Sequence, residues 1–276
     1  MKICLACGNR FASNDWRCPS CHKYPETVNG FISFSPALAE ENRFFGAEYF
    51  EPLFKLESQN FWFRSRNRLL AWTLRRYFPF ARSFFEIGVG TGFVLSHIRR
   101  EFPDLILSGS DIFVKALDMA AKRLPGVSLF QMDARLIPFD LEFDIIGAFD
   151  LLEHIDEDDL VLVQIFQATK EGGGILLTVP QHLFLWSASD EHVFHKRRYS
   201  RNELVRKVER AGFRVIRVTS FLFLLFPFMF FARMRQRRKR RDFDPSAELR
   251  IGRLLNASFE NVLRFELAMI KNGFSF

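Results

Sequence analysis

The stretch Phe84–Gly92 constrains the fold of this chain most, because an apolar strand-like run ends in an acidic residue and three alternating glycines. Glu86 comes first, and Gly88, Gly90 and Gly92 follow it. Glycine lets the backbone turn tightly and approach a ligand, and a helix that begins after such a turn presents unpaired N–H groups there. Glycines alone are a weak signal, but this arrangement is typical of a loop that binds a nucleotide-like cofactor.

Acidic residues also follow the three apolar runs that come next along the chain. Asp111 closes the second run, where a carboxylate can accept both hydroxyls of a ribose, although a helix N-cap is an alternative. Asp133 follows the third run, and a solvated loop aspartate is the alternative there. Asp150 ends the fourth run. Four such features in the correct order seldom arise by chance.

Together these stretches resemble the motifs of the class I S-adenosylmethionine (SAM) methyltransferases, and the ubiquinone-biosynthesis (type 11) group among them. The resemblance implies an α/β fold with a doubly wound, mostly parallel, Rossmann-like sheet, and SAM as the cofactor. It implies that Asp133 reads the adenine amino group and that Asp150 lies beneath the methionine part. The cofactor contacts that it implies are Glu86, Gly88, Gly90, Gly92, Asp111, Ile112, Asp133, Ala134 and Asp150.

Strand-like and helix-like segments alternate from Ser83 onwards, which predicts a parallel sheet with ligands at the carboxyl ends of its strands. The expected helices are 93–102, 114–123, 159–169, 201–211 and 260–271. The expected strands are 105–110, 127–132, 143–149, 175–179 and 213–219, with a glycine turn at 172–174. After 260–271 no room remains for the seventh, antiparallel strand of such folds, so either the sequence is truncated or the sheet edge is completed differently.

The segments before Ser83 are expected to form two smaller units. We predict a zinc ribbon over 1–30 and a helical linker and cap over 31–82, with the catalytic domain over 83–276. A turn-rich linker is expected at 24–35, short helices between 37 and 56, and an amphipathic helix over 69–78. In related methyltransferases such a helix often covers the SAM site. The arginines just before it, between Phe61 and Arg68, are equally compatible with a solvated face.

All four cysteines lie near the N-terminus, as the pairs Cys4/Cys7 and Cys18/Cys21. Two Cys-x-x-Cys knuckles at this separation are typical of a small zinc ribbon, and Gly8 can relieve the turn after the first pair. Four thiolates leave no position for water or substrate, so we expect the zinc to be structural. Disulfides and redox catalysis are alternatives, which a reducing compartment and the absence of a βαβ context disfavour.

His195 is the residue that we predict to act as the catalytic base. It lies in the loop 180–200 after the fifth strand, and histidine titrates near neutral pH. The loop resembles the His-x-x-Arg-Tyr-Ser segment of the same methyltransferase group, in which Arg198 and Tyr199 would hold the loop or an anionic group of the substrate. The alternative is that His195 only packs, while Ser200 caps the following helix.

His154 is a second catalytic candidate, because Asp150, Glu153 and His154 have the spacing of one helical turn. Some ubiquinone O-methyltransferases use a similar acidic-x-x-Glu-His segment to hold a divalent metal near the acceptor. The resemblance therefore implies a metal at these three residues. The alternative is a helix start, where acidic residues favour the N-terminus.

The charge and the aromatic content point to an anionic partner. The net charge is +7, the sequence pI is near 9.4, and 35 residues are phenylalanine. The insertion 221–241 begins with an apolar stretch and ends in a cluster of arginines. Its twelve apolar residues would span only about 18 Å as a helix, so we expect attachment to an anionic membrane surface without crossing it. A buried lid helix is the alternative.

The expected function is methyl transfer from SAM to a small or lipid-linked acceptor, such as a quinone precursor or a glycan intermediate, at a hydroxyl. The rival function is methylation of ribosomal or transfer RNA, with the ribbon as the docking module. The segment 150–153 opposes the rival, because it stands where base-methylating enzymes usually have an Asn/Asp-Pro-Pro-aromatic clamp. A non-enzymatic interaction protein is a third hypothesis. No signal peptide is visible, so we expect a cytoplasmic location.

Overall fold

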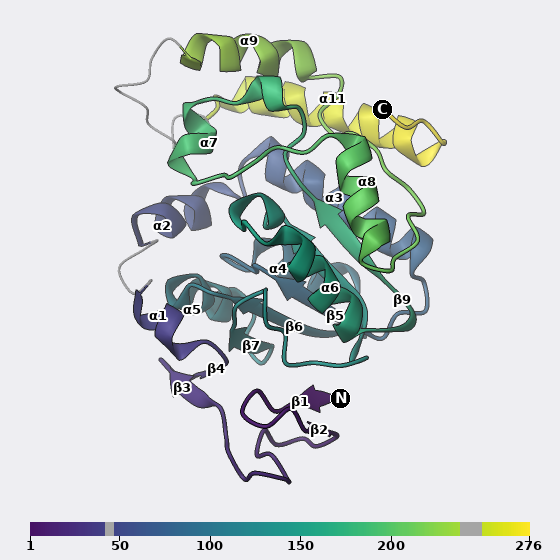
Figure 1. The fold of residues 1–276 in the computed structure, drawn as a ribbon. Coiled ribbons are helices and arrows are strands. Elements are labelled where there is room, and N and C mark those ends of the chain that lie inside the picture. Colours follow the sequence, from purple (N-terminus) through teal and green to yellow (C-terminus); the bar gives the residue numbers. More distant parts are fainter. Residues whose placement is uncertain (42–46, 238–249) are drawn as a thin grey trace.

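A seven-stranded sheet with helices on both faces forms the centre of the protein, and a two-stranded ribbon lies beside one of its edges (Figure 1). The structure is a computed structural model that describes residues 1–41, 47–237 and 250–276. The strand order is β3-β4-β7-β6-β5-β8-β9, and every neighbouring pair except the β3–β4 hairpin is parallel. This order confirms the predicted doubly wound, mostly parallel sheet.

The described elements have the following bounds. The strands are β1 Lys2–Ile3, β2 Arg10–Phe11, β3 Glu26–Val28, β4 Phe31–Ser33, β5 Ser83–Ile87, β6 Ile106–Asp111, β7 Ser128–Gln131, β8 Phe143–Phe149 and β9 Thr169–Thr178. The α-helices are α1 Pro36–Glu41, α2 Ala47–Leu56, α3 Phe61–Tyr77, α4 Phe93–Glu101, α5 Val114–Arg123, α6 Asp158–Ala168, α7 Ala188–His192, α8 Arg201–Arg210, α9 Phe226–Arg237 and α11 Arg253–Lys271. Two short 3₁₀ helices are η1 Leu152–His154 and η2 Leu183–Leu185.

Alternating side chains of the central strands build two separate cores, one on each face of the sheet. In β5, Phe84 joins the core formed with α3, α4 and α5, whereas Phe85 joins the core formed with α6 and α8. Ile145 and Ile146 of β8 divide in the same way. Successive residues of a strand point to opposite faces, so a continuous apolar run is needed where both faces are covered. This explains why the central strands read as uninterrupted hydrophobic sequence.

The predicted linker 24–35 is wrong in part, because β3 and β4 form a hairpin that extends the main sheet. The turn residues Asn29 and Gly30 lie between the two strands, and both have positive φ. Ile32 and Ser33 pair with Phe130 and Gln131 of β7. The turn signal was therefore genuine, but the flanking residues form strands because β7 offers them an open edge.

The predicted strand 213–219 is also wrong, because these residues form no strand in the described structure. Phe213 and Val215 do pack against the core, so the alternation in the sequence reports correctly which side chains point inward. A strand also needs a partner with a matching register, and β9 bulges at its amino end, where Gly172 has a φ of +75°. The sheet thus gains its remaining strands from the N-terminal hairpin, at the opposite edge.

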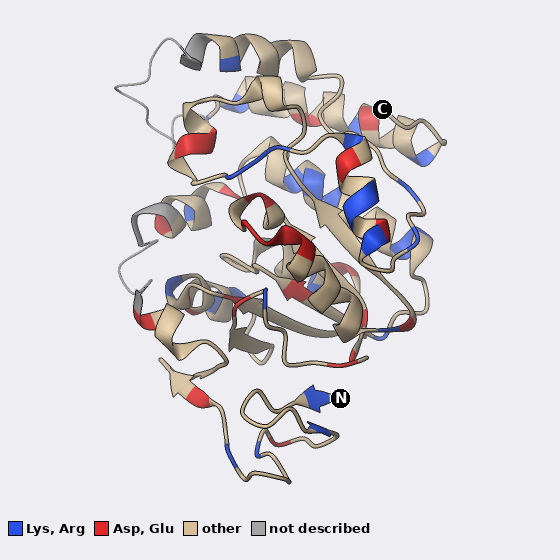
Figure 2. Cartoon of the chain, viewed as in Figure 1, with Lys and Arg blue, Asp and Glu red and all other residues tan. Residues whose placement is uncertain are grey.

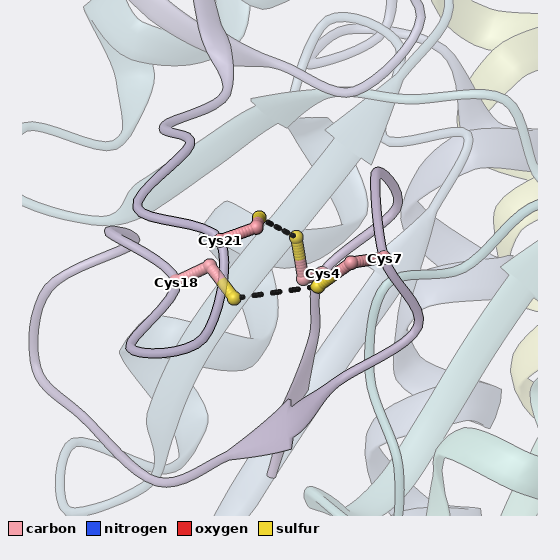
Figure 3. A group of neighbouring side chains, drawn as sticks. All are labelled: Cys4, Cys7, Cys18 and Cys21. Atoms are coloured by element: carbon pink, nitrogen blue, oxygen red, sulfur yellow. Dashed lines mark hydrogen bonds between the residues drawn. The ribbon is translucent and has the colours of Figure 1, made fainter.

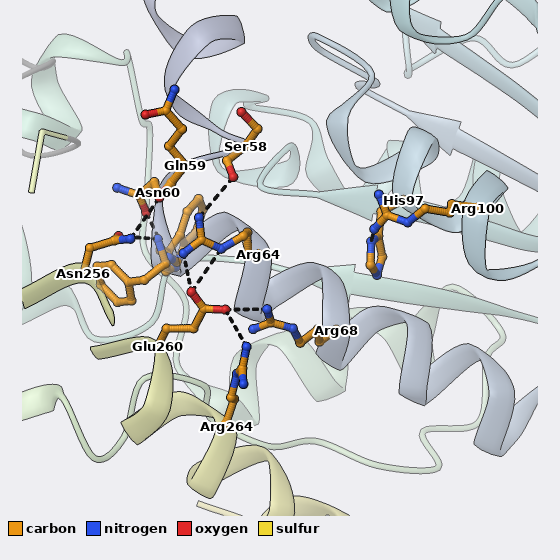
Figure 4. Close-up of polar contacts among 12 residues, drawn as sticks. Ser58, Gln59, Asn60, Arg64, Arg68, His97, Arg100, Asn256, Glu260 and Arg264 are labelled. Carbon is orange, nitrogen blue, oxygen red and sulfur yellow. Dashed lines mark hydrogen bonds and ion pairs between the residues drawn. The ribbon is translucent and has the colours of Figure 1, made fainter. Parts of the chain in front are cut away.

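The C-terminal helix α11 packs against α3 through a shared carboxylate (Figure 4). Glu260 of α11 accepts hydrogen bonds from Arg64 and Arg68 of α3 and from Arg264 on its own helix. Burial tends to raise the pKa of Glu260, but the hydrogen bonds from the arginines prevail and lower it to about 2. The three arginines therefore hold an ionised carboxylate between the two helices across the physiological pH range.

Candidate cofactor and acceptor site

The predicted cofactor loops meet at the carboxyl edge of the sheet. The chain runs from β5 outward to β6 and β7 on one side and returns to β8 and β9 on the other, so the crevice lies where the strand order reverses. Ligands of open α/β sheets bind at this switch point. The glycine loop connects β5 to α4 there, and the segments that follow β6, β7 and β8 border the same cavity.

The three glycines of the loop meet different steric demands, although all have positive φ, between 52° and 76°. A Cβ atom on Gly88 would lie 3.0 Å from the side chain of Leu151, and one on Gly92 would lie 3.0 Å from the backbone of Ala120. A Cβ atom on Gly90 would meet no atom within 4 Å. A side chain at Gly92 would thus press on backbone and one at Gly88 on a leucine side chain, whereas Gly90 faces the open cavity.

Two buried carboxylates flank this loop. Oε2 of Glu86 has no hydrogen-bond partner among the described residues, and burial raises the pKa of Glu86 well above its usual value despite the nearby Arg66. Asp111 accepts hydrogen bonds from the backbone N–H groups of Gly90, at 2.8 Å, and Phe113, at 2.9 Å. Burial nevertheless raises the pKa of Asp111 to about 6. Each carboxylate keeps free acceptor positions for a ligand.

Of the arginines between Phe61 and Arg68, Arg66 of α3 lines the cavity. Its guanidinium pairs with Asp150 and stacks on the ring of Trp62 at 4.6 Å, while its Nε has no hydrogen-bond partner among the described residues. Arg64 and Arg68 instead bind Glu260 on α11. One arginine therefore faces the cavity and two serve helix packing.

The remaining predicted cofactor residues also border the cavity, and two of them are already engaged. Ile112 and Ala134 line it without polar side chains. Both carboxylate oxygens of Asp133 accept hydrogen bonds from Arg135, at 2.8–3.1 Å. Asp150, with a φ of +53°, accepts a hydrogen bond from Thr178 at 3.0 Å besides its pair with Arg66. The adenine contact of Asp133 stays a prediction.

A second polar group, which no sequence pattern indicated, connects the cap to the glycine loop. Glu57, just after α2, is buried and accepts hydrogen bonds from the hydroxyl of Thr91, between Gly90 and Gly92. Arg123 of α5 pairs with Glu57 and stacks on the ring of Phe54 at 3.9 Å. Burial raises the pKa of Glu57, and these partners oppose the increase. The cap is thereby fixed over the cofactor loop.

The cavity continues past the cofactor loops to the segment around His195, with a volume of about 2490 Å³. Nδ1 of His195 lies 2.9 Å from the carboxylate of Asp190. Because a carboxylate accepts hydrogen bonds, Nδ1 is the donor, so Nε2 carries the lone pair in the neutral ring. Arg198 holds Asp190 with two hydrogen bonds of 2.8 and 3.1 Å, and the pKa of Asp190 is well below its usual value because these bonds outweigh its burial.

A metal-capable group does form near His195, but its composition differs from the predicted one. Ligand atoms of Glu153, His154 and His195 all lie within 4.8 Å of one another, whereas Asp150 is held by Arg66 and Thr178 instead. Asp150 has positive φ and precedes η1, so the three predicted residues do not share a helical turn. The predicted group of Asp150, Glu153 and His154 is replaced by one that includes His195.

Both side-chain oxygens of Glu153 lack a hydrogen-bond partner among the described residues, although the residue is completely buried. Burial raises the pKa of Glu153 well above its usual value, and the nearby Asp150 adds to the increase. Burial also lowers the pKa of His154 to about 4, with a contribution from His195. His154 is therefore neutral at physiological pH and offers a lone pair.

The loop that carries His195 is anchored by its last residues. Tyr199 is buried and donates a hydrogen bond of 2.7 Å to Asp158, at the start of α6, and Lys207 of α8 pairs with the same carboxylate. Figure 2 shows acidic residues, in red, at the start of α6 and in the segment before it, beside the basic residues of α8. Ser200 caps α8 in a capping box with Glu203, as predicted. Arg198 and Tyr199 thus hold the loop.

A family model described as a methyltransferase domain matches residues 54–218, which is more than half of the chain and includes the glycine loop, the acidic residues after the next three strands and the loop of His195. This chain belongs to the methyltransferase domain family. The match confirms the predicted relationship to the class I SAM-dependent methyltransferases.

Three similar proteins agree with this assignment to the methyltransferases. A ubiquinone/menaquinone biosynthesis C-methyltransferase of Desulfotalea psychrophila is 30% identical over 34% of this chain and 40% of its own length. A "probable S-adenosylmethionine-dependent methyltransferase" of Mycolicibacterium smegmatis is 24% identical over 58% of this chain and 62% of its own length. The chain thus spans less than two thirds of either relative.

The third similar protein is a solved structure of a SAM-dependent methyltransferase of Thermotoga maritima, titled a possible histamine N-methyltransferase. It is 25% identical, covers 64% of this chain and 82% of its own length, and has a TM-score of 0.50. Its likeness to this methyltransferase supports the Rossmann-like arrangement of the sheet.

Outside the matched region, the four thiols of this methyltransferase converge as predicted (Figure 3). Sγ of Cys4 lies 3.6 Å from that of Cys21, and Sγ of Cys7 lies 3.6 Å from that of Cys18. Zn–S bonds of 2.3 Å in a tetrahedron place sulfur atoms about 3.8 Å apart, so the group fits one zinc ion. The distances also exclude disulfides, whose S–S bond is about 2.05 Å.

The two knuckles have the same backbone turn, which explains their convergence. The N–H of Gly8 donates to the carbonyl of Cys4, and the N–H of His22 donates to the carbonyl of Cys18. Gly8 and His22 both have positive φ, as the turn after each cysteine pair requires. The sequence predicted this turn only at Gly8, because a glycine signals it and a histidine does not.

Trp16 attaches the ribbon to the main domain. Its ring packs against Phe34, Phe130 and Phe139, with centroids 4.6–5.7 Å apart. The N–H of Ile3 also donates to the carbonyl of Pro138. The ribbon is thus continuous with the core beneath the sheet edge, and a loss of its structure would expose part of that core.

Proposed function

We propose that this protein transfers a methyl group from SAM to a hydroxyl of a small or lipid-linked acceptor. The observation that carries the proposal is the cavity wall around the glycine loop. There an open Gly90 lines the same cavity as Glu86 and Arg66, each of which has a buried polar atom without a partner among the described residues. Buried polar atoms usually have partners, so unpartnered ones beside a cavity indicate a ligand.

The residues around the loop fit SAM part by part. Asp111 would accept the ribose hydroxyls, Gly90 would allow the close approach of the sugar, and Glu86 lies beside both. Arg66 would bind the carboxylate of the methionine part, because a guanidinium matches a carboxylate in charge and shape. Bound SAM supplies an electrophilic methyl group whose transfer returns an electron pair to sulfur.

On the acceptor side, His195 would remove the proton of the acceptor hydroxyl. Its Nε2 has the lone pair, while Asp190 and Arg198 fix the ring and stabilise the imidazolium that forms. The proton passes from oxygen to Nε2 as the oxygen–carbon bond forms. The protein's remaining contribution is to hold the acceptor in line with the methyl group.

The group of Glu153, His154 and His195 also fits a divalent cation, which would lower the pKa of a bound hydroxyl in place of a simple base. The unpartnered oxygens of Glu153 and the neutral His154 suit such an ion, and Asp190 would orient His195 from behind, as carboxylates do for metal-bound histidines. Activity that survives exhaustive chelation, with the ribbon zinc retained, would assign the chemistry to His195 alone.

Replacing Arg66 with glutamine is expected to weaken SAM binding by about 10- to 150-fold, because hydrogen bonds to charged groups contribute roughly 1.5–3 kcal/mol. Binding of methylthioadenosine, which lacks the amino-acid part, should not change. Arg64→Gln is the matched control, because Arg64 lies on the same helix but binds Glu260. Calorimetric titration measures the affinity for both ligands. Equal losses of affinity for SAM and methylthioadenosine would show that Arg66 does not bind the carboxylate of SAM.

SAM affinity is expected to fall as the pH drops through about 6. Burial places the pKa of Asp111 near that value in the free protein, and hydroxyl donors favour its ionised form, so binding releases a proton below pH 6. Affinity should therefore rise up to about pH 6 and then level off. Titrations across this range compare the wild type with Asp111→Asn, in which this pH dependence should disappear; an unchanged pH dependence would contradict the assignment.

Transfer of labelled methyl from SAM into a host extract tests the proposed function as a whole. The extract is separated into lipid, RNA and water-soluble fractions, with heat-killed protein and the His195→Ala variant as controls. Label in the lipid or water-soluble fraction that depends on His195 supports the proposal. Label in RNA would favour the rival function and make the ribbon a docking module, and the absence of label in every fraction would argue against an enzyme.

A further inference from the structure

Helix α9 is apolar on two opposite sides, which is unusual for a helix at the surface of a protein. Phe226, Met229 and Arg233, at helical spacing, line the cavity beneath it. Phe228 and Phe231 lie on the other side and are 64% and 70% exposed. A surface helix normally pairs an apolar inner face with a polar outer one. The outer face of α9 therefore requires an explanation beyond folding.

The exposed aromatic residues of α9 belong to a larger surface. Phe184 contacts Phe230, which contacts Phe231, and Phe228 contacts Phe259 on α11. Figure 1 shows α9 along the first half of α11, in the opposite direction. The exposed residues of this surface, which we name the α9 face, are Leu183, Phe184, Phe228, Phe231, Leu254 and Leu255. Leu254, in the first turn of α11, is 88% exposed.

The charge around the α9 face favours an anionic partner over a second copy of this chain. Arg250 and Arg253 are exposed next to Leu254. In a dimer formed through this face, like charges would meet. An anionic bilayer surface offers apolar burial and opposite charge together. RNA offers the charge but no apolar interior for the phenylalanines and leucines.

The described helices also limit how deeply the protein can insert into a bilayer. Within the described ranges, no helix combines the length and apolar character that crossing a bilayer requires. An apolar face bordered by arginines is typical of a helix that lies in the interfacial region, parallel to the membrane.

The cavity beneath α9 connects this surface to the proposed chemistry. Its volume of about 2490 Å³ exceeds the roughly 300–1,000 Å³ of ordinary ligand pockets, so room remains beside a cofactor. Leu222, Phe226 and Met229 form apolar lining next to the α9 face. We propose that the α9 face binds the surface of an anionic lipid bilayer, and that an acceptor anchored in that bilayer enters the cavity beneath α9. The second part rests on the proposed function.

Sedimentation of the full chain with vesicles tests the docking part. Binding is expected to vesicles of phosphatidylcholine with phosphatidylglycerol, and only weakly to vesicles of phosphatidylcholine alone. The double variant Phe228→Ser/Phe231→Ser should bind the anionic vesicles about tenfold more weakly or worse. Phe80→Ser is the matched control: Phe80 is 91% exposed but precedes β5, at the amino edge of the sheet. Its binding should equal that of the wild type.

A second pair of variants tests the charge. Arg250→Glu/Arg253→Glu should lose most of the preference for phosphatidylglycerol, whereas Arg82→Glu, an exposed arginine at the amino edge, should keep it. Equal binding of the variants and the wild type, or no binding by any of them, would overturn the proposal. Light scattering could instead show that the wild type is a dimer and that Phe228→Ser/Phe231→Ser is a monomer. That result would assign the α9 face to a second copy of the chain and would also overturn the proposal.

The two parts can fail separately. Vesicle binding is measured without SAM and is therefore independent of methyl transfer. If the protein binds vesicles but labels only water-soluble material, the α9 face is supported as the docking surface and the lipid-linked acceptor is ruled out. If the protein labels lipid without binding vesicles, the proposed function is supported and the α9 face is ruled out as the docking surface.

Discussion

Replacing His195 with alanine is expected to lower kcat by about 10²- to 10⁴-fold, the usual contribution of a positioned general base. SAM affinity should change by no more than about twofold, because the residue lies on the acceptor side of the cavity. The expected loss follows from the geometry of the ring: Nδ1–H donates a hydrogen bond to Asp190, so Nε2 carries the lone pair of the neutral imidazole. Single-turnover methyl transfer measures the chemical step directly.

Added imidazole distinguishes a base from a packing residue. The space left by the ring can hold free imidazole, so partial recovery of activity in His195→Ala is expected, and a merely structural role would not allow it. His97→Ala is the control, because His97 lies on α4 and does not line the cavity. Full activity of His195→Ala would eliminate the proposed base, and a loss that imidazole does not relieve would favour the packing alternative or a metal.

Replacing Cys18 with serine is expected to abolish zinc binding and to lower the free energy of unfolding by at least about 3 kcal/mol. Structural zinc contributes roughly 10–16 kcal/mol in isolated zinc-finger peptides. We expect less here, because the ribbon can detach from the sheet edge while the main core persists. The loss of Trp16 from that core accounts for the expected minimum.

Elemental analysis and denaturant unfolding measure this effect. The wild type, purified without chelator, should contain one zinc ion per chain, and Cys18→Ser should contain none. Ser20→Ala is the matched control, because Ser20 is exposed within the same knuckle. A wild type without zinc, or equal unfolding curves for the two variants, would show that the thiols do not form a metal site.

The glycine loop and its neighbouring strands could be predicted from the sequence because their determinants are local. A strand, an acidic residue and glycines with positive φ occur within one stretch, Phe84–Gly92, and the structure forms the loop there. The bounds of α5 and β8 agree with the prediction to the residue. Such elements depend on apolar periodicity and turn chemistry, which sequence shows directly.

The contacts around His195 and Glu57 could be predicted only in part because they join distant segments. The exchange of Asp150 for His195 in the metal-capable group depends on where the loop 180–200 folds back over η1. Glu57 and Arg123 meet only because α2 lies against α5. The spacing of these residues along the chain does not indicate that they meet. In the same way, the hairpin β3–β4 forms because β7 leaves an edge that no local pattern reveals.

The most direct test of the central claim compares SAM binding by Gly90→Ala and Gly126→Ala. Both glycines have positive φ, and a Cβ atom on either would meet no protein atom within 4 Å, so the two variants carry similar backbone strain. Only Gly90 lines the cavity. We expect similar losses of thermal stability in both variants and a loss of SAM affinity of about tenfold or more in Gly90→Ala alone. Equal SAM affinity of the two variants would contradict it.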